Sequence, residues 1–245
     1  HFFRAPTDND KGFGNWIAKD WKNNRLDSPE ISVAKPIDAV RNADGTVTVT
    51  TSTVCKYANG NIRTDYTYTM DAEGSVDFHA VYTPEGSLPP LPCVGNTFVL
   101  PANMTQLSWY GMGMQDTYPD RLEAAWIGRW SNTVDKEYVH YARPQDSGNH
   151  EQTAEVTITD KNGRGWTVTA EDGKPFSFSA LPYSIQQLST TAHDCDLAID
   201  NNVYLNIDAA VMGLGNSSCG PGVLTKYAIQ QKPYELHVRF TKVKK

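Results

Sequence analysis

The chain has 245 residues, a mass of 27.2 kDa and a formal net charge of −6. Hydrophobic residues make up 39% and charged residues 20%, a balance typical of a globular protein and unlike that of a disordered one. Phosphate binding needs a basic surface, so the excess of 28 acidic over 22 basic residues argues against a nucleic-acid partner. The sequence has no run of 18 apolar residues, so it predicts no membrane-spanning helix and no membrane partner.

No internal repeat or low-complexity tract divides the chain, so we predict a single domain over residues 1–245. The chain opens on His1 rather than Met and continues at once with the apolar residues Phe2 and Phe3. We therefore expect a piece of a longer polypeptide. Any targeting segment would then lie outside this sequence, and the sequence leaves the compartment open.

Alternation of apolar and polar residues with a period of two dominates the chain. It predicts strands that each bury one face, in chain order over residues 47–49, 62–70, 76–82, 154–158, 166–170, 203–207 and 234–240. Dipeptides that favour tight turns lie between these segments: Asp44 with Gly45, Asn59 with Gly60, Glu73 with Gly74, Asn162 with Gly163, and Asp172 with Gly173. The pattern predicts an all-β fold, a large antiparallel β-sandwich with a few short helices.

Two segments favour short helices. Residues 14–24 place Trp16, Ile17 and Trp21 on one side of an amphipathic helix. Residues 184–192 begin with Ser184 and carry Gln187 three positions later, the spacing of a capping box.

The four cysteines are separated by 38, 102 and 24 residues, and no CxxC pair occurs. This spacing suits no zinc site, and a domain of this size does not need disulfides. We therefore expect thiols without a role, and neither a metal site nor a cofactor in this chain.

Two loops are candidates for ligand contact. Residues 109–121 (WYGMGMQDTYPDR) combine aromatic rings with Asp116, Asp120 and Arg121, a mixture suited to sugar rings and hydroxyls. An aromatic-rich loop tied to its own backbone is the simpler alternative. Residues 212–222 (MGLGNSSCGPG) lack the third glycine of a dinucleotide motif and form either a flexible polar loop or the edge of a substrate site.

Glycoside hydrolysis needs two carboxylates on opposite sides of the scissile bond. The chain has enough acidic residues, but nothing in the sequence marks one as acid and another as nucleophile. His150 beside Glu151 would be the pair to consider for an aldose epimerase, which needs a general acid and a general base around the sugar ring.

Five motifs in order carry a resemblance to a known family. Residues 4–12 (RAPTDNDKG) resemble the start of the C-terminal β-domain of bacterial β-galactosidases of glycoside hydrolase family 2. Residues 109–121 resemble its W-x-G-x-G-P-x-E-x-Y-P-D-R signature, and residues 141–149 (YARPQDSGN) are similar to its Y-x-x-P-Q-E-x-G motif. Residues 178–188 and 205–215 resemble its F-S-A-x-x-Y-S-x-x-x-L and N-x-D-x-x-x-M-G-x-G patterns.

The resemblance implies a galactose-mutarotase-like β-supersandwich that borders the active site of a β-galactosidase. The catalytic glutamates of that family lie on a separate (β/α)8 barrel, so no catalytic residue is expected here. It also implies that any divalent or monovalent cations of the parent bind elsewhere, that the parent forms a homo-oligomer, and that it is found in the bacterial cytoplasm or periplasm.

The resemblance also implies roles for particular residues. The candidate pocket edge comprises Gly113, Asp116, Ser218 and Cys219. The candidate interface with the barrel comprises Phe2, Phe3, Arg4, Asp8, Asn9 and Asp10. We expect Phe2, Phe3 and parts of 109–118 to form an exposed apolar patch there.

The sequence departs from the family pattern at three positions. A tryptophan on which the sugar stacks in the best-known members aligns with Cys219 or its neighbours, and the chain has Met114 and Asp116 where Pro and Glu are usual. Loss of a stacking ring removes about 1 kcal/mol of sugar contact. The parent's substrate is therefore open between another β-galactoside and a decorated glycan. A free-standing carbohydrate-binding module and an aldose epimerase are the alternative functions for this chain.

Overall fold

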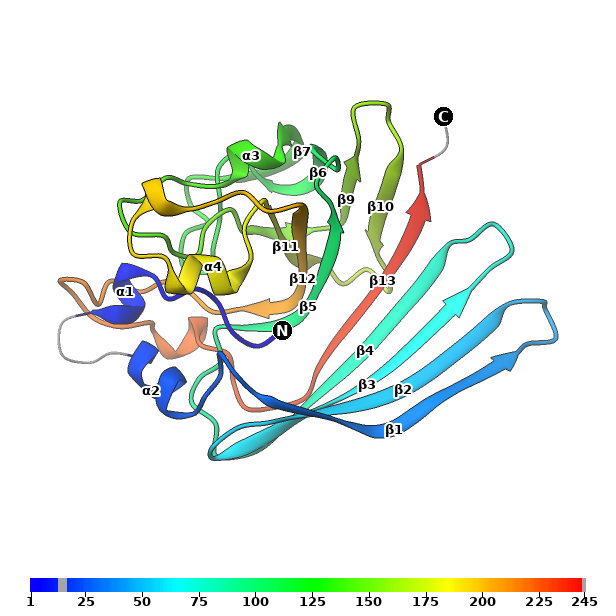
Figure 1. Ribbon diagram of the computed structural model, residues 1–245, viewed down its shortest axis with the longest axis horizontal. Coiled ribbons are helices and arrows are strands. Elements are labelled where there is room, and N and C mark those ends of the chain that lie inside the picture. The colour runs from blue at the N-terminus through cyan, green and yellow to red at the C-terminus, as the bar shows by residue number, and fades with distance from the viewer. Residues whose placement is uncertain (13–16, 244–245) are drawn as a thin grey trace.

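The computed structural model describes residues 1–12 and 17–243 (Figure 1). This part of the chain folds into one nine-stranded and one four-stranded sheet, and all of the strand pairs are antiparallel. The all-β antiparallel prediction is therefore confirmed. No helix within the described residues is long and apolar enough to cross a membrane.

Strand order in the larger sheet brings the last strand of the chain into its middle. From one edge to the other, the strands are β1 (Glu30–Arg41), β2 (Val47–Lys56), β3 (Gly60–Met70), β4 (Val76–Gly86), β13 (Tyr234–Lys242), β10 (Gly165–Ala170), β9 (Glu155–Thr159), β6 (Gln106–Gly113) and β7 (Trp126–Thr133).

The smaller sheet and the short helices complete the described chain. The order in this sheet is β5 (Cys93–Pro101), β12 (Asn202–Val211), β11 (Phe176–Leu181) and β8 (His150–Thr153). The helices are α1 (Asp8–Lys11), α2 (Ile17–Asn23), α3 (Val134–Glu137) and α4 (Ile185–Thr190), with two 3₁₀ turns, η1 (Asp194–Asp196) and η2 (Thr225–Tyr227).

Every segment predicted as a strand lies wholly or mainly within a strand, and the buried faces agree with the alternation. In β4, Phe78, Ala80 and Tyr82 are buried, and in β13 Leu236 and Val238 are buried. Four of the five turn dipeptides join paired neighbours: β1 to β2, β2 to β3, β3 to β4, and β9 to β10.

The fifth turn prediction, at Asp172 and Gly173, is wrong as a hairpin. It connects β10 in the larger sheet to β11 in the smaller one. Both residues have positive φ, 55° and 66°, so the local turn chemistry is as predicted. A sharp turn can redirect the chain into another layer as readily as it can close a hairpin.

The two helix predictions have different outcomes. Residues 184–192 contain α4, where Ser184 and Gln187 form the predicted capping box. Residues 14–24 contain α2, which buries Trp21. Trp16, which was expected on the same side, lies outside the described residues.

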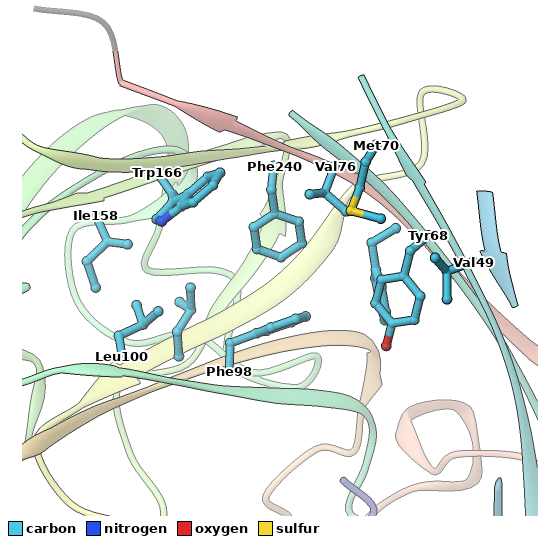
Figure 2. Close-up of a pocket in the computed structure, with 11 residues that line it drawn as sticks. Val49, Tyr68, Met70, Val76, Phe98, Leu100, Ile158, Trp166 and Phe240 are labelled. Atoms are coloured by element: carbon cyan, nitrogen blue, oxygen red, sulfur yellow. The ribbon is translucent and has the colours of Figure 1, made fainter. Parts of the chain in front are cut away.

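The core lies between the two sheets and includes Phe78, Val156, Phe178, Leu205, Ile207 and Val238. A four-stranded sheet cannot cover a nine-stranded one, so a cleft of about 420 Å³ opens where the sheets diverge. Figure 2 shows Trp166 and Phe240 of the larger sheet facing Phe98 and Leu100 of β5 across this cleft. It is lined almost entirely by apolar side chains.

The hairpins and the loops occupy opposite ends of the molecule. The long strands β1–β4 extend to the right in Figure 1, away from the helices. Helices α1, α2 and α4 gather at the left, beside the orange segment that follows β12. The motifs that drew attention in the sequence therefore meet at one end.

Candidate functional site

Arg4 anchors the loop after β12 to the amino-terminal segment. It makes a two-point ion pair with Asp10, Nε to Oδ2 at 3.1 Å and Nη2 to Oδ1 at 2.8 Å. Its Nη1 donates to the carbonyl of Met212 at 2.8 Å and its Nη2 to that of Gly213 at 3.1 Å. Arg4 and Asp10 are 2% and 1% exposed. The first and fifth sequence motifs are thus held together by a buried charge pair.

Asp120 fastens the loop after β6 to the loop after β12. Its Oδ1 accepts from the amide of Leu214 at 2.9 Å and its Oδ2 from that of Gly215 at 2.8 Å. A Cβ at Gly213 would lie 2.7 Å from the Asp120 carboxyl carbon. Glycine is therefore required at 213, because the carboxylate approaches the backbone closely.

The carbonyl of Gly215 joins three loops. It accepts from Arg121 Nη2 at 2.6 Å and from Asn9 Nδ2 at 2.8 Å. Arg121 Nη2 also donates to Asn216 Oδ1 at 2.9 Å, and the amide of Ser218 donates to Asn9 Oδ1 at 3.2 Å. These polar contacts give the loop 213–218 a defined position.

The segment 141–149, which contains Gln145 and Asp146, is the fourth of the five motifs to join this network of hydrogen bonds. Gln145 Oε1 accepts from the amide of Asp8 at 2.9 Å, and the amide of Asp146 donates to the carbonyl of Ala5 at 3.0 Å. Tyr118 donates its hydroxyl to Asp146 Oδ2 at 2.7 Å. Burial raises the pKa of Asp146 to about 6, although the nearby Arg4 opposes the shift.

Asp116 contacts the segment 141–149 and is partly buried. Its Oδ2 accepts from the amide of Gly148 at 3.3 Å. Burial raises the pKa of its carboxyl group, and this amide offsets part of the effect. The next residue, Thr117, exchanges hydrogen bonds with Asn149 at 2.6 and 2.7 Å, which fixes the loop to the segment before β8.

These loops enclose a cavity of about 450 Å³. Its lining comprises Gln115, Asp116, Tyr118, Asp120, Arg121, Glu123, Ala124, Tyr141 and Leu214. Carboxylates, a guanidinium group and phenol rings are groups that bind sugar hydroxyls and the apolar faces of sugar rings. A volume in the range of small-molecule sites makes this the candidate functional site.

The structure brings only some of the predicted pocket-edge residues together. Asp116 lines the cavity. Ser218 and Cys219 lie further along the loop whose start, Leu214, lines it, and the Cys219 side chain is exposed. Gly113 is buried at the end of β6, where a Cβ would lie 2.6 Å from the Trp130 ring. Gly113 therefore makes room for Trp130 instead of lining the cavity.

The predicted apolar patch at Phe2 and Phe3 is wrong. Phe2 is 7% exposed and meets Tyr82 edge to face, with ring centroids 5.8 Å apart. Phe3 is half-buried against Trp21. The reason is that the amino-terminal segment runs into the body of the domain and adds its rings to the core.

Of the other residues predicted at the barrel interface, Arg4 and Asp10 are buried in their ion pair and cannot present a docking surface. Asp8 is exposed and Asn9 is half-buried. Within 109–118, Tyr110 and Met114 are exposed.

Sequence reasoning missed the part played by Tyr141, Gln115 and Leu214 in the cavity. Tyr141 opens the segment 141–149 and Leu214 lies in the segment 205–215, so both were within motifs already noted. The motifs gave no information on which side chains would face one another. All four cysteines carry free thiols, Cys93 buried and Cys195 and Cys219 exposed.

A two-sheet antiparallel domain whose loops surround a polar cavity is thus the class that the fold and site define. A family model described as "Beta galactosidase small chain" matches residues 1–240. The chain therefore belongs to the beta-galactosidase small-chain family.

The relatives that match most of the chain are named beta-galactosidases. The chain is 32% identical over 224 residues to a beta-galactosidase of Streptococcus thermophilus, covering 87% of this chain and 20% of that protein. It is 33% identical over 218 residues to the beta-galactosidase BgaC of Bifidobacterium adolescentis, covering 87% and 20%. The chain thus spans about one fifth of the length of these relatives.

Solved structures give weaker similarity. A GalM/aldose epimerase homologue from C. elegans aligns with a TM-score of 0.38 and 11% identity, over 84% of this chain and 68% of that one. A galactose mutarotase-like protein from Lactobacillus casei aligns with a TM-score of 0.32 and 11% identity, over 84% and 72%. Similarity at this level does not decide the fold. The description of the fold rests on the two sheets given above, and the mutarotase-like assignment stays a prediction.

Proposed function

We propose that this chain is the C-terminal, non-catalytic domain of a β-galactosidase, where it forms one edge of the pocket for a terminal β-galactoside. The observation that carries the proposal is that three sequence motifs line one cavity. Asp120 and Arg121 join two of them, and Arg4 ties the first motif to the same loop. The catalytic carboxylates lie on a barrel domain outside this chain.

The chemistry of the cavity supports a role in sugar binding. Asp116 and Arg121 can accept from and donate to hydroxyl groups, and the Tyr141 ring is 41% exposed at the rim. Burial and the neighbouring Asp116 raise the pKa of the Tyr141 hydroxyl, so it stays protonated and can donate.

The bonding of Asp120 supports a non-catalytic role. Glycoside hydrolysis needs one carboxylate as acid and another as nucleophile or base. Both oxygens of Asp120 already accept backbone amides, and Oδ2 lies 3.3 Å from Arg121 Nη1. A carboxylate held in this way positions a loop and is not free to attack or protonate a substrate.

The structure does not favour the aldose epimerase alternative. His150 is fully buried, with its ring between those of Trp109 and Phe178 at 4.3 and 5.0 Å. Its Nε2 lies 2.6 Å from Glu137 Oε2. A sugar ring cannot reach this imidazole, so the pair of His150 and Glu151 cannot act on one.

The test compares release of nitrophenol from nitrophenyl-β-galactoside by the 245-residue chain and by a protein that includes the upstream sequence of the parent. We expect turnover in the longer protein alone. Asp116→Asn and Arg121→Ala in that protein should raise KM, whereas Lys161→Ala, on the distant β9–β10 hairpin, should not. Turnover by the 245-residue chain that is lost in Asp116→Asn would overturn the proposal.

The free-standing binding module is tested separately by calorimetry of the 245-residue chain with galactose and lactose. We expect no heat of binding at millimolar sugar, because part of the pocket wall belongs to the barrel. Saturable binding that Tyr141→Ala abolishes would favour the module instead.

A further inference from the structure

Three metal-ligating side chains meet inside the domain, away from the cavity described above. They are His1, Cys93 and Asp208, and their ligand atoms all lie within 4.8 Å of one another. His1 Nε2 lies 2.8 Å from Asp208 Oδ1, and His1 Nδ1 lies 3.6 Å from Cys93 Sγ. Cys93 and Asp208 are buried, and the His1 side chain is 16% exposed. A nitrogen, a sulfur and an oxygen atom that can each bind a metal ion therefore lie together in a largely buried site.

The fold holds each of the three side chains from a separate backbone segment. The amide of Gly95 donates to the carbonyl of His1 at 3.1 Å, and the backbone nitrogen of His1 donates to the carbonyl of Gly95. Cys93 lies two residues earlier on β5, and Asp208 lies on β12, opposite Gly95. Strand pairing thus sets the positions of Cys93 and Asp208, and two backbone hydrogen bonds to Gly95 set that of His1.

Two features of the strands direct Asp208 toward the cluster. The β5–β12 register shifts between Asp208 and Ala210, an irregularity of the kind that re-aims a side chain. A Cβ at Gly95 would overlap Asp208 Oδ1, so only glycine leaves room for the carboxylate at this point.

A small polar cavity adjoins the cluster. Its volume is about 10 Å³, and its lining includes Asn149, Ser179 and Asn206 in addition to the three side chains. The charged residues Arg4, which is paired with Asp10, and Asp146 also line it. This is about the space that one water molecule needs, and the amide and hydroxyl groups can serve as its partners. The site therefore has room for one further oxygen ligand.

We propose that His1, Cys93 and Asp208 bind a divalent first-row transition-metal ion, with Zn²⁺ as the best fit. Zinc takes nitrogen, sulfur and oxygen donors in tetrahedral sites, and a water molecule in the adjoining cavity completes the four. A thiolate and a carboxylate balance the charge of the ion. The proposal replaces the expectation from sequence that this chain has no metal site.

Binding requires a change in protonation and a small movement. Tetrahedral ligands at zinc bond lengths are about 3.5 Å apart. His1 Nδ1 and Cys93 Sγ, 3.6 Å apart, already have this spacing. Asp208 Oδ1 lies 2.8 Å from the other ring nitrogen, Nε2, so this contact must break before the imidazole and the carboxylate can bind one ion. The Cys93 sulfur–hydrogen bond breaks, the sulfur–metal bond forms, and the proton leaves to solvent. A proton on the coordinating nitrogen of His1 leaves in the same way. Without metal, the imidazole of His1 contacts the Asp208 carboxylate through Nε2 and the Cys93 thiol through Nδ1, so the three groups serve as one another's hydrogen-bond partners.

The test is a titration of the chelator-treated protein with Co²⁺ and then Zn²⁺. The protein carries additional residues before His1, so that a free α-amino group cannot supply a ligand. We expect a thiolate-to-cobalt charge-transfer band, displaced by zinc, and at least one proton released per ion bound. Cys93→Ser should abolish the band and weaken binding at least tenfold, and His1→Gln should weaken it similarly.

Matched controls use the two exposed cysteines. Cys195→Ser and Cys219→Ser should leave the band and the affinity unchanged. A band that persists in Cys93→Ser, or binding without proton release, would overturn the proposal. If Cys93→Ser does not fold, zinc-edge X-ray absorption of the wild-type protein decides: one sulfur in the coordination shell supports the site, and a shell of oxygen and nitrogen alone rejects it.

Discussion

Arg4 and Asp10 form a buried two-point ion pair six positions apart in the sequence, and the same guanidinium group holds two carbonyls of the loop after β12. The aspartate also accepts from the amide of Thr7 at 2.9 Å, which closes the capping box of α1. One charge pair therefore ties the amino-terminal segment to the loop whose Leu214 lines the candidate cavity. Burial lowers the pKa of Arg4, but the nearby Asp10 carboxylate more than offsets this and raises the pKa above its ordinary value, so the guanidinium group stays charged.

Arg4→Gln should destabilise the protein by about 3–5 kcal/mol, because it leaves the Asp10 carboxylate buried without its partner. Urea denaturation measures the loss. Arg63→Gln is the matched control, since Arg63 and Asp65 form a similar two-point pair whose side chains are 47% and 44% exposed. That change should cost much less, because water and salt screen an exposed ion pair. Equal losses in the two variants would contradict the structural role given to Arg4.

Strands with one buried face could be predicted from sequence, because apolar residues at every second position indicate which face is buried. In β13, Leu236 and Val238 are buried and Glu235 is exposed, as the pattern indicates. The edge strand β1 escaped prediction: Pro36 interrupts its pattern, and every residue of it is exposed, including Ile31 and Val33.

The candidate site could be predicted only as a set of motifs. Asp120 and Leu214 are 94 positions apart, and no local pattern indicates that one accepts from the amide of the other. Burial of Phe2 was missed for the same reason: its partner Tyr82 lies on a strand far along the chain. Contacts between distant segments depend on how the sheets stack, which alternation does not specify.

Asp120→Asn tests the link between the two loops. An asparagine oxygen can still accept one backbone amide, but its NH₂ group would face the second, so one buried donor loses its partner at a cost of about 1–3 kcal/mol. We expect faster hydrogen exchange at the amides of Leu214 and Gly215. Glu123→Gln, an exposed change in the same loop, should leave both rates unaltered. Unchanged exchange in Asp120→Asn would show that other contacts hold the loop.

Gly113→Ala tests the close approach of Trp130 to β6. The new methyl group would lie 2.6 Å from the indole, and Trp130 Nε1 would have to leave the carbonyl of Gly111, to which it donates at 3.2 Å. We expect a loss of about 1–3 kcal/mol and a change in tryptophan fluorescence. Gly222→Ala is the control, because its nearest neighbour is the flexible tip of Ser217 at 3.3 Å. A fluorescence spectrum unaltered by Gly113→Ala would mean that the indole does not lie against this strand.

Glu151 gives a dependence of stability on pH with a definite sign. Burial raises its pKa from 4.5 to about 7, although Asn149 and Ser177 donate to Oε1 at 2.8 and 2.9 Å. Below pH 4.5 the carboxyl group is protonated in both the folded and the unfolded state, and its contribution to stability is fully present. Between pH 4.5 and 7 the unfolded state ionises first, so this contribution falls and is lost above pH 7.

Glu151→Gln removes that ionisation and keeps an oxygen acceptor for both donors. The variant should therefore be more stable than the wild type above pH 7, by about 2 kcal/mol once partial solvent access is allowed for. The difference should shrink through the window from 7 to 4.5 and vanish below it. Urea midpoints of the two proteins across this range measure the difference curve. A curve independent of pH, or one that favours the wild type at pH 8, would mean that the Glu151 carboxylate is stabilised in the folded state instead of being opposed by burial.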